Sequence, residues 1–255
     1  MSLFELKDKI AIVTGGAGGI GTCIASEYAR AGASVVIVSR KKENLDKVAA
    51  EIKAFGRESM AIATDVCVPE QVDNMVKQTM DKFGRIDILV NNAGGGSLPT
   101  MPEELTFEGW NAIIALNLTG TFLCSIAAGK VMIQQKSGKI INISSVAGIK
   151  GSQGMAHYGA AKAGVINLTK SLANAWAQYN INVNCIAPGL TATPGLKSLG
   201  WIPSDKKEDG TPIPPLLIPH RPEEVAYLAL FLASSLSDHI SGELIPLRGS
   251  VELDH

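Results

Sequence analysis

The apolar positions of the chain fall into short β-branched runs that alternate with longer segments of helical periodicity. Several short runs are apolar at nearly every position, which predicts strands of a parallel sheet that is covered on both faces. The predicted strands are residues 9–14, 35–39, 59–64, 86–91, 139–144 and 181–187, with a last one near 244–247. The predicted helices are residues 20–31, 43–55, 70–83, 107–135, 154–179 and 222–233.

Glycine and proline mark the ends of these helices. Four glycines stand just past predicted helices, where a left-handed C-cap needs no Cβ: Gly32, Gly56, Gly84 and Gly138. Pro69 and Pro222 suit first helical turns. Strict alternation of strand and helix implies right-handed crossovers and an α/β fold with a doubly wound sheet. No linker or repeat interrupts it, so residues 1–255 are interpreted as one domain.

One segment breaks the alternation. Residues 188–222 carry eight of the chain's 12 prolines and a charged patch at 205–209. A long irregular insertion in a compact domain usually forms a lid or a binding loop, and the alternative is a solvated surface excursion. The segment follows a strand, at the edge where open α/β sheets bind ligands. We therefore expect a substrate lid at about residues 190–221.

Composition excludes several classes of protein. Of the 255 residues, 46% are hydrophobic and 18% are charged, which excludes a disordered chain. The 23 basic and 24 acidic residues leave a net charge of −1, without the basic footprint of a nucleic-acid binder. No apolar run approaches the roughly 20 residues of a membrane span. The four cysteines lack metal-ligand spacing, so we expect no metal site and reduced thiols in a cytoplasmic protein.

Glycine is in excess, with 26 of the 255 residues, or about a tenth of the chain, against a usual share of about 7%. The first strand leads into Thr14-Gly15-Gly16-Ala17-Gly18-Gly19-Ile20-Gly21, which opens a helix. Glycines in such a turn let the backbone approach a pyrophosphate, and the helix N-terminus offers it unpaired N–H groups and a positive dipole. The order of strand, glycine turn and helix predicts a dinucleotide site.

The residues after the second strand bear on which dinucleotide binds. NAD sites usually place an Asp or Glu at this strand end, whereas NADP sites have an Arg nearby for the 2′-phosphate. Here Ser39 ends the strand, and Arg40, Lys41 and Lys42 follow. Cations at a helix start oppose its dipole, which favours a ligand role, and Arg40 offers a bidentate fork to a phosphate. We expect NADP(H), with NAD(H) as the less favoured alternative.

A tyrosine and a lysine have the spacing of a proton-transfer pair. Tyr158 and Lys162 lie four positions apart on a predicted helix and share one face. A nearby ammonium would lower the pKa of the phenol, so that Tyr158 could exchange a proton with an alcohol or a ketone. Ser144 and Ser145 stand at the carboxyl end of the fifth predicted strand, the edge where sites form.

Asparagines supply two further signals. Asn91-Asn92-Ala93-Gly94 ends the fourth predicted strand, again at the carboxyl edge. Asn117 lies inside the predicted helix 107–135, where Asn is a mediocre helix former, so a bulged or water-bonded turn is expected there.

With these motifs in order, the sequence resembles the short-chain dehydrogenase/reductase family from Lys9 to about Gly242. The spacing from Thr14 to Gly21 resembles the family's cofactor motif, and Asn91–Gly94 its Asn-Asn-Ala-Gly signature. Pro188-Gly189 is similar to the motif after its sixth strand. The resemblance implies a seven-stranded, mostly parallel Rossmann sheet with helices on both faces, a nicotinamide cofactor and a homo-oligomer.

The resemblance also implies a role for each matched residue. Asn117, Ser145, Tyr158 and Lys162 match the catalytic tetrad. Tyr158 would exchange the proton, Lys162 would hold the nicotinamide ribose, Ser145 would orient the substrate oxygen, and Asn117 would hold a relay water. The further cofactor contacts would be Gly15, Gly18, Gly19, Ile20, Gly21, Ser39, Arg40, Lys41, Asp65, Val66, Asn92, Ala93, Gly94, Pro188, Gly189, Leu190, Thr191 and Thr193.

Two regions depart from the family pattern. The C-terminus reads Ile245-Pro246-Leu247-Arg248-Gly249-Ser250 where many relatives have Val-Asp-Gly-Gly. Pro246 lacks a ladder donor and fits best near a strand end or at a sheet edge. This region packs at a subunit interface in many relatives, and the long helices at 107–135 and 154–179 resemble those that pair subunits. A homotetramer is expected, with a dimer as the alternative.

The lid is the second departure, because it is stiff and apolar. Trp201 would either cover an apolar substrate or pack on the protein. With Ser145 and Tyr158, the residues expected to line the substrate pocket are Gln153 and Met155, whereas His157 is expected to be dispensable.

The leading hypothesis is an NADP(H)-dependent oxidoreductase that interconverts a ketone and a secondary alcohol, with a 3-oxoacyl thioester as the family default. A dehydrogenase of a steroid, a sugar or a small hydroxy compound is the alternative. A non-catalytic dinucleotide sensor on the same fold is the hypothesis from another class. The filled tetrad favours catalysis over sensing.

Overall fold

Seven parallel strands form one sheet in the order β3-β2-β1-β4-β5-β6-β7. The computed structural model describes residues 4–96 and 99–247. The strands are β1 (Ile10–Thr14), β2 (Ser34–Ser39), β3 (Ser59–Ala63), β4 (Ile88–Asn91), β5 (Gly138–Ile143), β6 (Ile181–Pro188) and β7 (Leu244–Leu247). The chain winds outward from β1 to β3 and then from β4 to β7. The predicted doubly wound α/β sheet is confirmed, and it is parallel throughout.

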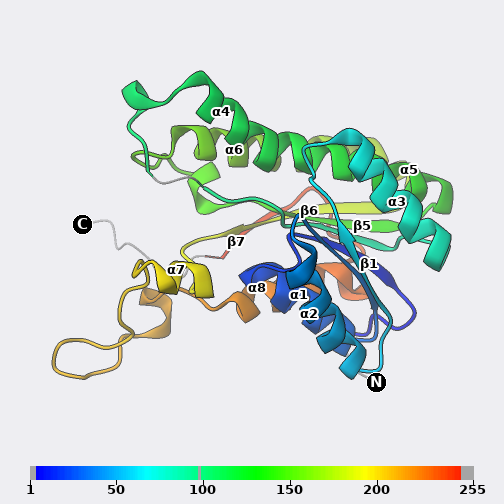
Figure 1. Cartoon of the computed structure of the whole chain (residues 1–255), viewed down its shortest axis with the longest axis horizontal. Helices are drawn as coiled ribbons and strands as arrows, with labels where there is room; N and C mark the ends of the chain where they lie inside the picture. Colours follow the sequence, from blue (N-terminus) through cyan, green and yellow to red (C-terminus); the bar gives the residue numbers. More distant parts are fainter. Residues whose placement is uncertain (1–3, 97–98, 248–255) are drawn as a thin grey trace.

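Helices cover both faces of this sheet (Figure 1). One face carries α1 (Gly19–Arg30), α2 (Lys42–Ala54) and α8 (Pro222–Ala233), and the other carries α3 (Pro69–Phe83), α5 (Gly120–Gln135) and α6 (Ala156–Trp176). Along β1, Ala11 and Val13 join the first core and Ile12 joins the second. Because successive strand residues point to opposite faces, two cores require strands that are apolar at every position.

The predicted helix 107–135 is continuous but changes its hydrogen-bond period. It consists of α4 (Phe107–Ile114), a π-helical turn (Ala115–Thr119) and α5. The bulge expected at Asn117 is therefore present. Among the described residues this is the one helical stretch long and apolar enough to cross a membrane by length and composition. Here its α5 part packs against β4, β5 and α3, as a core helix does.

Most of the helix ends follow the glycine and proline pattern. Gly32, Gly56 and Gly84 adopt the predicted positive φ, and Pro69 and Pro222 begin α3 and α8. The prediction for Gly138 was wrong. Lys136, with φ 55°, ends α5 in the left-handed region, and Gly138 begins β5 instead. A Cβ at Gly138 would lie 2.4 Å from Met132 Sδ, so glycine serves close packing there.

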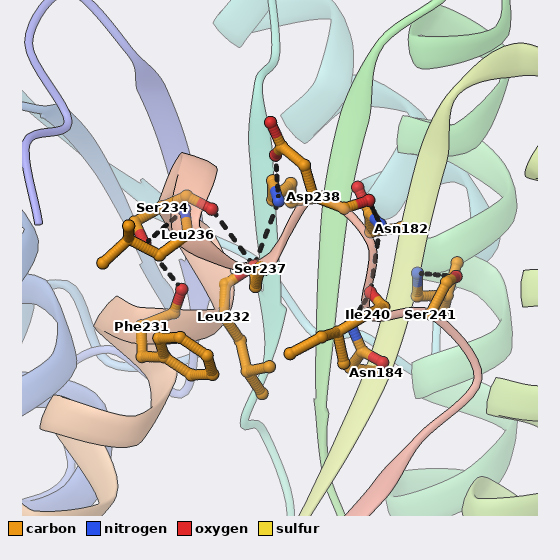
Figure 2. A network of polar contacts seen from close by, with 12 residues as sticks. Asn182, Asn184, Phe231, Leu232, Ser234, Leu236, Ser237, Asp238, Ile240 and Ser241 are labelled. Atoms are coloured by element: carbon orange, nitrogen blue, oxygen red, sulfur yellow. Dashed lines mark hydrogen bonds and ion pairs between the residues drawn. The ribbon is translucent and has the colours of Figure 1, made fainter.

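A polar network fixes the last strand (Figure 2). The amide of Asn182 on β6 donates to the carbonyls of Asp238 and Ile240, and Ser237 Oγ donates to Leu232 O at 2.8 Å. These bonds hold the connection from α8 to β7 against β6. β7 is the edge strand, and Pro246 pairs there with Ala187. The expected edge position of Pro246 is confirmed, while residues 248–250 lie outside the described residues.

The segment predicted as a lid, residues 190–221 (the lid segment), is less irregular than expected. It contains a short helix, α7 (Pro194–Ser198), and a 3₁₀ turn, Pro215–Leu217. The N-cap side chain of α7, Thr193, accepts a hydrogen bond from Leu196 N. Figure 1 shows α7 and the lid segment at the same end of the molecule as α4.

The contact of α5 with α6 predicts an intolerant glycine. A Cβ at Gly129 would lie 2.5 Å from the Trp176 ring, so Gly129→Ala should destabilise the fold by about 1–3 kcal/mol, although Ala is the better helix former. Gly195→Ala, at a helical glycine with open space around it, is the matched control and should change the free energy of unfolding little. Urea unfolding measures both, and equal effects would contradict the close-packing argument.

Candidate active site

The glycine turn after β1 is too crowded for side chains. Gly15 has φ 63°, and a Cβ there would lie 2.8 Å from Asn92 Nδ2. A Cβ at Gly21 would lie 2.2 Å from the carbonyl oxygen of Gly15. Gly18 is the N-cap of α1 and makes no side-chain cap, while Gly19 and Ile20 begin the helix. The first N–H groups of α1 therefore have no side-chain acceptor at this cap and are available to an anion.

The turn is held by the residues that end β4. Thr14 Oγ1 accepts hydrogen bonds from the N–H groups of Asn92 and Ala93, both at 3.0 Å. Asn92 Nδ2 donates to the carbonyls of Thr14 and Gly15 at 3.1 and 3.2 Å. β1 and β4 are neighbours at the point where the strand order reverses, which is where open α/β sheets form crevices. These contacts therefore join the two strand ends at the edge where the site is expected.

A second group of predicted cofactor contacts lies where β2 and β3 finish side by side. Ser39 ends β2, and Arg40 and Lys41 are exposed beyond it. After β3, the Asp65 carboxylate accepts a hydrogen bond from Cys67 N at 2.9 Å, and Val66 is buried against Gly120. The positive charge of Arg40 reaches Cys67, where it opposes the burial that raises the pKa of the thiol to about 11.

The four tetrad positions come together from three elements. Ser145 follows β5, Tyr158 and Lys162 lie on α6, and Asn117 lies in the π-helical turn. A hydrogen bond joins the side chains of Ser145 and Tyr158, and Lys162 Nζ lies 5.6 Å from the centre of the Tyr158 ring. Asn117 donates to Gly95 O at 2.9 Å and accepts from Gly95 N at 3.0 Å. An added Cβ at Gly94 would lie 2.7 Å from Asn117 Oδ1 and 3.1 Å from Lys162 Nζ.

The two adjacent serines have different surroundings. Ser144 Oγ donates to the backbone carbonyl of Lys162 at 2.8 Å and is buried. Ser145 Oγ accepts from Ala147 N at 3.2 Å and pairs with Tyr158. Ser144 thus attaches β5 to α6, and Ser145 is the serine that faces the tyrosine.

The pKa of Tyr158 differs from expectation. Burial raises it above the ordinary value for tyrosine, and only the hydrogen bond with Ser145 opposes the rise. Lys162 has no lowering effect on it here, and Nζ donates to the carbonyl oxygen of Ile143 at 2.9 Å. Lys162 is itself 4% exposed, and burial lowers its pKa to about 8.

The residues predicted to line the substrate pocket differ in their exposure and in their distance from Tyr158. Met155 and Tyr158 both flank Gly96, where an added Cβ would lie 3.0 Å from Met155 Cε and 4.0 Å from Tyr158 Cδ2. Gln153 is exposed, and His157 is buried. Trp201 follows α7 in the lid segment and is exposed. Its backbone N–H donates to Leu196 O, which attaches it to that helix.

The predicted cofactor contacts after β6, residues 188–193, lie over the glycine turn. A Cβ at Gly19 would lie 2.9 Å from Thr193 Cβ. Pro188 ends β6, Leu190 is exposed, and Thr191 is buried. Thr191 contacts His220, a residue that sequence reasoning missed because nothing in its local pattern marks it.

The comparisons with known proteins agree with this arrangement. The sequence model of the family described as short chain dehydrogenase matches residues 9–200. The chain is 42% identical to the 3-oxoacyl-[acyl-carrier-protein] reductase of Synechocystis sp., over 96% of this chain and 98% of that protein. It is 37% identical to the (2S)-[(R)-hydroxy(phenyl)methyl]succinyl-CoA dehydrogenase subunit BbsD of Thauera aromatica, over 97% and 98%. A short-chain type dehydrogenase/reductase from Mycobacterium marinum superposes with a TM-score of 0.89 at 36% identity, covering 98% of each chain.

The buried Lys162 predicts a stability that depends on pH. Its pKa falls from 10.5 in the unfolded chain to about 8, so between these values the unfolded chain binds more protons and the fold gains stability as pH rises. Lys162→Met removes the buried charge and should stabilise the protein by about 1–3 kcal/mol at pH 7, with a smaller gain at pH 9.5. Urea unfolding at both pH values measures the difference.

The matched control is Lys170→Met, which removes an exposed ammonium from the same helix. It should show no such dependence on pH. A Lys162→Met gain that is the same at pH 7 and pH 9.5 would contradict the depressed pKa.

Proposed function

The chain belongs to the short-chain dehydrogenase family, and we propose that it is an NADP(H)-dependent oxidoreductase that interconverts a ketone and a secondary alcohol. The observation that carries the proposal is the gathering of Ser145, Tyr158, Lys162 and Asn117 beside the glycine turn, at the carboxyl edge of the sheet. A dinucleotide sensor on the same fold needs the glycine turn but not these four side chains.

The residues present fit a nicotinamide dinucleotide. The uncapped first turn of α1, with Gly18, Gly19 and Ile20, offers N–H donors to a pyrophosphate, and Gly15, Gly19 and Gly21 lack the side chains that would crowd the turn. Asp65 and Val66 would hold the adenine, and Asn92, Ala93 and Gly94 the ribose. Residues 188–191 and Thr193 would hold the nicotinamide. When bound, the cofactor supplies or accepts the hydride.

Electrostatics favour the phosphorylated form of the cofactor. Arg40 and Lys41 are exposed beside Ser39, and β2 ends without a carboxylate. An exposed guanidinium can bind a 2′-phosphate with two parallel hydrogen bonds, whereas a carboxylate at the strand end would repel it. This favours NADP(H) over NAD(H).

Tyr158 is the proposed proton donor, and burial keeps it protonated by raising its pKa. At neutral pH the phenol keeps its proton, which it would give to the oxygen of a ketone as that oxygen gains charge. Ser145 would donate a hydrogen bond to the same oxygen. Lys162 would hold the ribose hydroxyls, and Asn117, fixed by Gly95 and Ile113, would hold a water between Lys162 and solvent. Met155, Gln153 and Trp201 would contact the rest of the substrate.

The relatives favour an acyl thioester as substrate. The Synechocystis protein is named for a 3-oxoacyl group on a carrier protein, and the Thauera protein for a hydroxylated acyl-CoA. Both groups carry the reacting oxygen on an acyl chain held as a thioester. We propose a 3-oxoacyl thioester as the first substrate class for this chain.

We extend the proposal to organisation. Residues 1–255 would act as one domain with a lid at about 190–221, in a cytoplasmic homo-oligomer. Phe107 and Phe122, which are 74% and 44% exposed on α4 and α5, support an interface along these helices.

The first test is turnover of a panel of ketones, including a 3-oxoacyl thioester, with NADPH and with NADH. Tyr158→Phe should lower kcat by roughly 10²–10⁴-fold, which is the contribution of general acid catalysis, and should leave the Kd for NADPH nearly unchanged. Absorbance at 340 nm measures turnover and fluorescence titration measures binding. Tight NADPH binding by the wild type without turnover of any ketone would favour the sensor hypothesis.

The second test addresses the choice of cofactor. Ser39→Asp places a carboxylate beside the proposed 2′-phosphate and should lower the ratio of kcat/KM for NADPH to that for NADH by about tenfold or more. Asn44→Asp, which adds the same charge at an exposed position within α2, is the control. An unchanged ratio in Ser39→Asp would refute the assignment of the phosphate site.

A further inference from the structure

The two ends of the lid segment are joined to each other. Thr191 and His220 form an isolated parallel β-bridge, and Ala192 N donates to His220 O at 2.8 Å. Their side chains meet as well, with 2.7 Å between Thr191 Oγ1 and His220 Nε2. Both residues are buried, at 4% and 7% exposure. The lid segment therefore leaves and re-enters the body of the protein at one place, the Thr191–His220 pair, which we call the neck.

Thr191 Oγ1 connects His220 to the backbone of Gly189. It lies 3.2 Å from Gly189 O, to which it donates, and 2.7 Å from His220 Nε2. With its single proton on Gly189 O, the hydroxyl accepts from His220 when the ring carries its proton on Nε2. Nδ1 has no hydrogen-bond partner in the described part of the chain. Burial lowers the pKa of His220, against an opposing effect of Glu224, which keeps the ring neutral at neutral pH. A chain of two hydrogen bonds thus runs from His220 through Thr191 to Gly189.

This chain ends in the loop that lies over the glycine turn. Gly189 N donates to Leu247 O at 2.8 Å, which attaches the loop to β7. Thr193 N donates to Thr191 O at 2.7 Å, and Thr193 packs on Gly19 at the start of α1. Any shift of Thr191 would therefore change the spacing between the loop and the glycine turn.

We propose that His220 is a positioning residue that acts through Thr191 to hold the 189–193 loop in the geometry that binds the nicotinamide half of the cofactor. The inference rests on the proposed function, since it needs NADPH at this site. It assigns a role to a residue outside the tetrad and outside the motifs. It also predicts that a change in the neck affects the binding of the nicotinamide end of the cofactor and not that of the other end, which would be bound by the glycine turn and Arg40.

The test compares the Kd of NADPH with the Kd of 2′-phospho-ADP-ribose, which lacks the nicotinamide ring that the 189–193 loop would contact. Thr191→Val removes the hydroxyl and keeps the shape. It should weaken NADPH about threefold to tenfold, the effect of losing the hydroxyl's hydrogen bonds to Gly189 and His220, and leave 2′-phospho-ADP-ribose unchanged. His220→Ala breaks only the bond to Thr191 and should weaken NADPH by no more than Thr191→Val, and the double variant should be no weaker than Thr191→Val, which already lacks that bond. Fluorescence titration and competition measure the affinities.

Conservative variants distinguish positioning from folding. Thr191→Ser keeps the hydroxyl and His220→Gln keeps a donor, so both should restore most of the NADPH affinity. His239→Gln makes the same change at an exposed histidine beyond α8 and should alter neither ligand. An equal loss for both ligands in Thr191→Val, or no loss for either, would overturn the positioning role. Wild-type protein that binds neither ligand would instead refute the proposed function, and this role with it.

Discussion

The site depends on one close approach, at the point where β1 gives way to α1. The backbone of Gly15, the backbone of Gly21 and the amide of Asn92 lie so near to one another that a Cβ at either glycine would overlap its neighbour. Thr14 Oγ1 then accepts both N–H groups of the β4 turn. Because these contacts join the first and fourth strands, they place the uncapped end of α1 beside Gly94. Gly94 in turn lies against Asn117 and Lys162. The glycine turn and the four tetrad positions are thus held by one connected set of contacts.

The second constraint is the burial of a charged amine. Lys162 Nζ has the Ile143 carbonyl as its partner, and burial lowers its pKa to about 8. The π-helical turn directs Asn117 into the same region, although the turn gives up the regular α-helical hydrogen bonds. Residues held this way reduce stability in return for a preorganised site, as is usual where activity requires buried polar groups. The bond from Ser144 to the Lys162 backbone fixes the position of α6 relative to the end of β5.

The lid segment is an excursion from the sheet that exposes apolar side chains. It enters and leaves through the Thr191–His220 neck and carries exposed apolar residues, among them Leu199, Trp201 and Leu216. Relatives at similar identity to this chain are named for different acyl groups. Exposed side chains of a connecting segment can change without disturbing the sheet, because they are not packed in its core.

The sequence by itself determined the features that depend on local periodicity and local backbone demand. Fully apolar runs predicted seven covered strands, glycines at 32, 56 and 84 predicted left-handed caps, and Asn117 predicted a bulge. Motif order predicted which strand ends would form the site. It did not predict that Lys136, rather than Gly138, ends α5. Gly138 is needed for another reason, because Met132 fills the space that the glycine leaves. Nor did the sequence predict that the pKa of Tyr158 rises, which follows from burial by distant segments. The pairing of Thr191 with His220 joins residues 29 positions apart, and only the tertiary structure decided it, because no local pattern encodes which distant side chain completes a hydrogen bond.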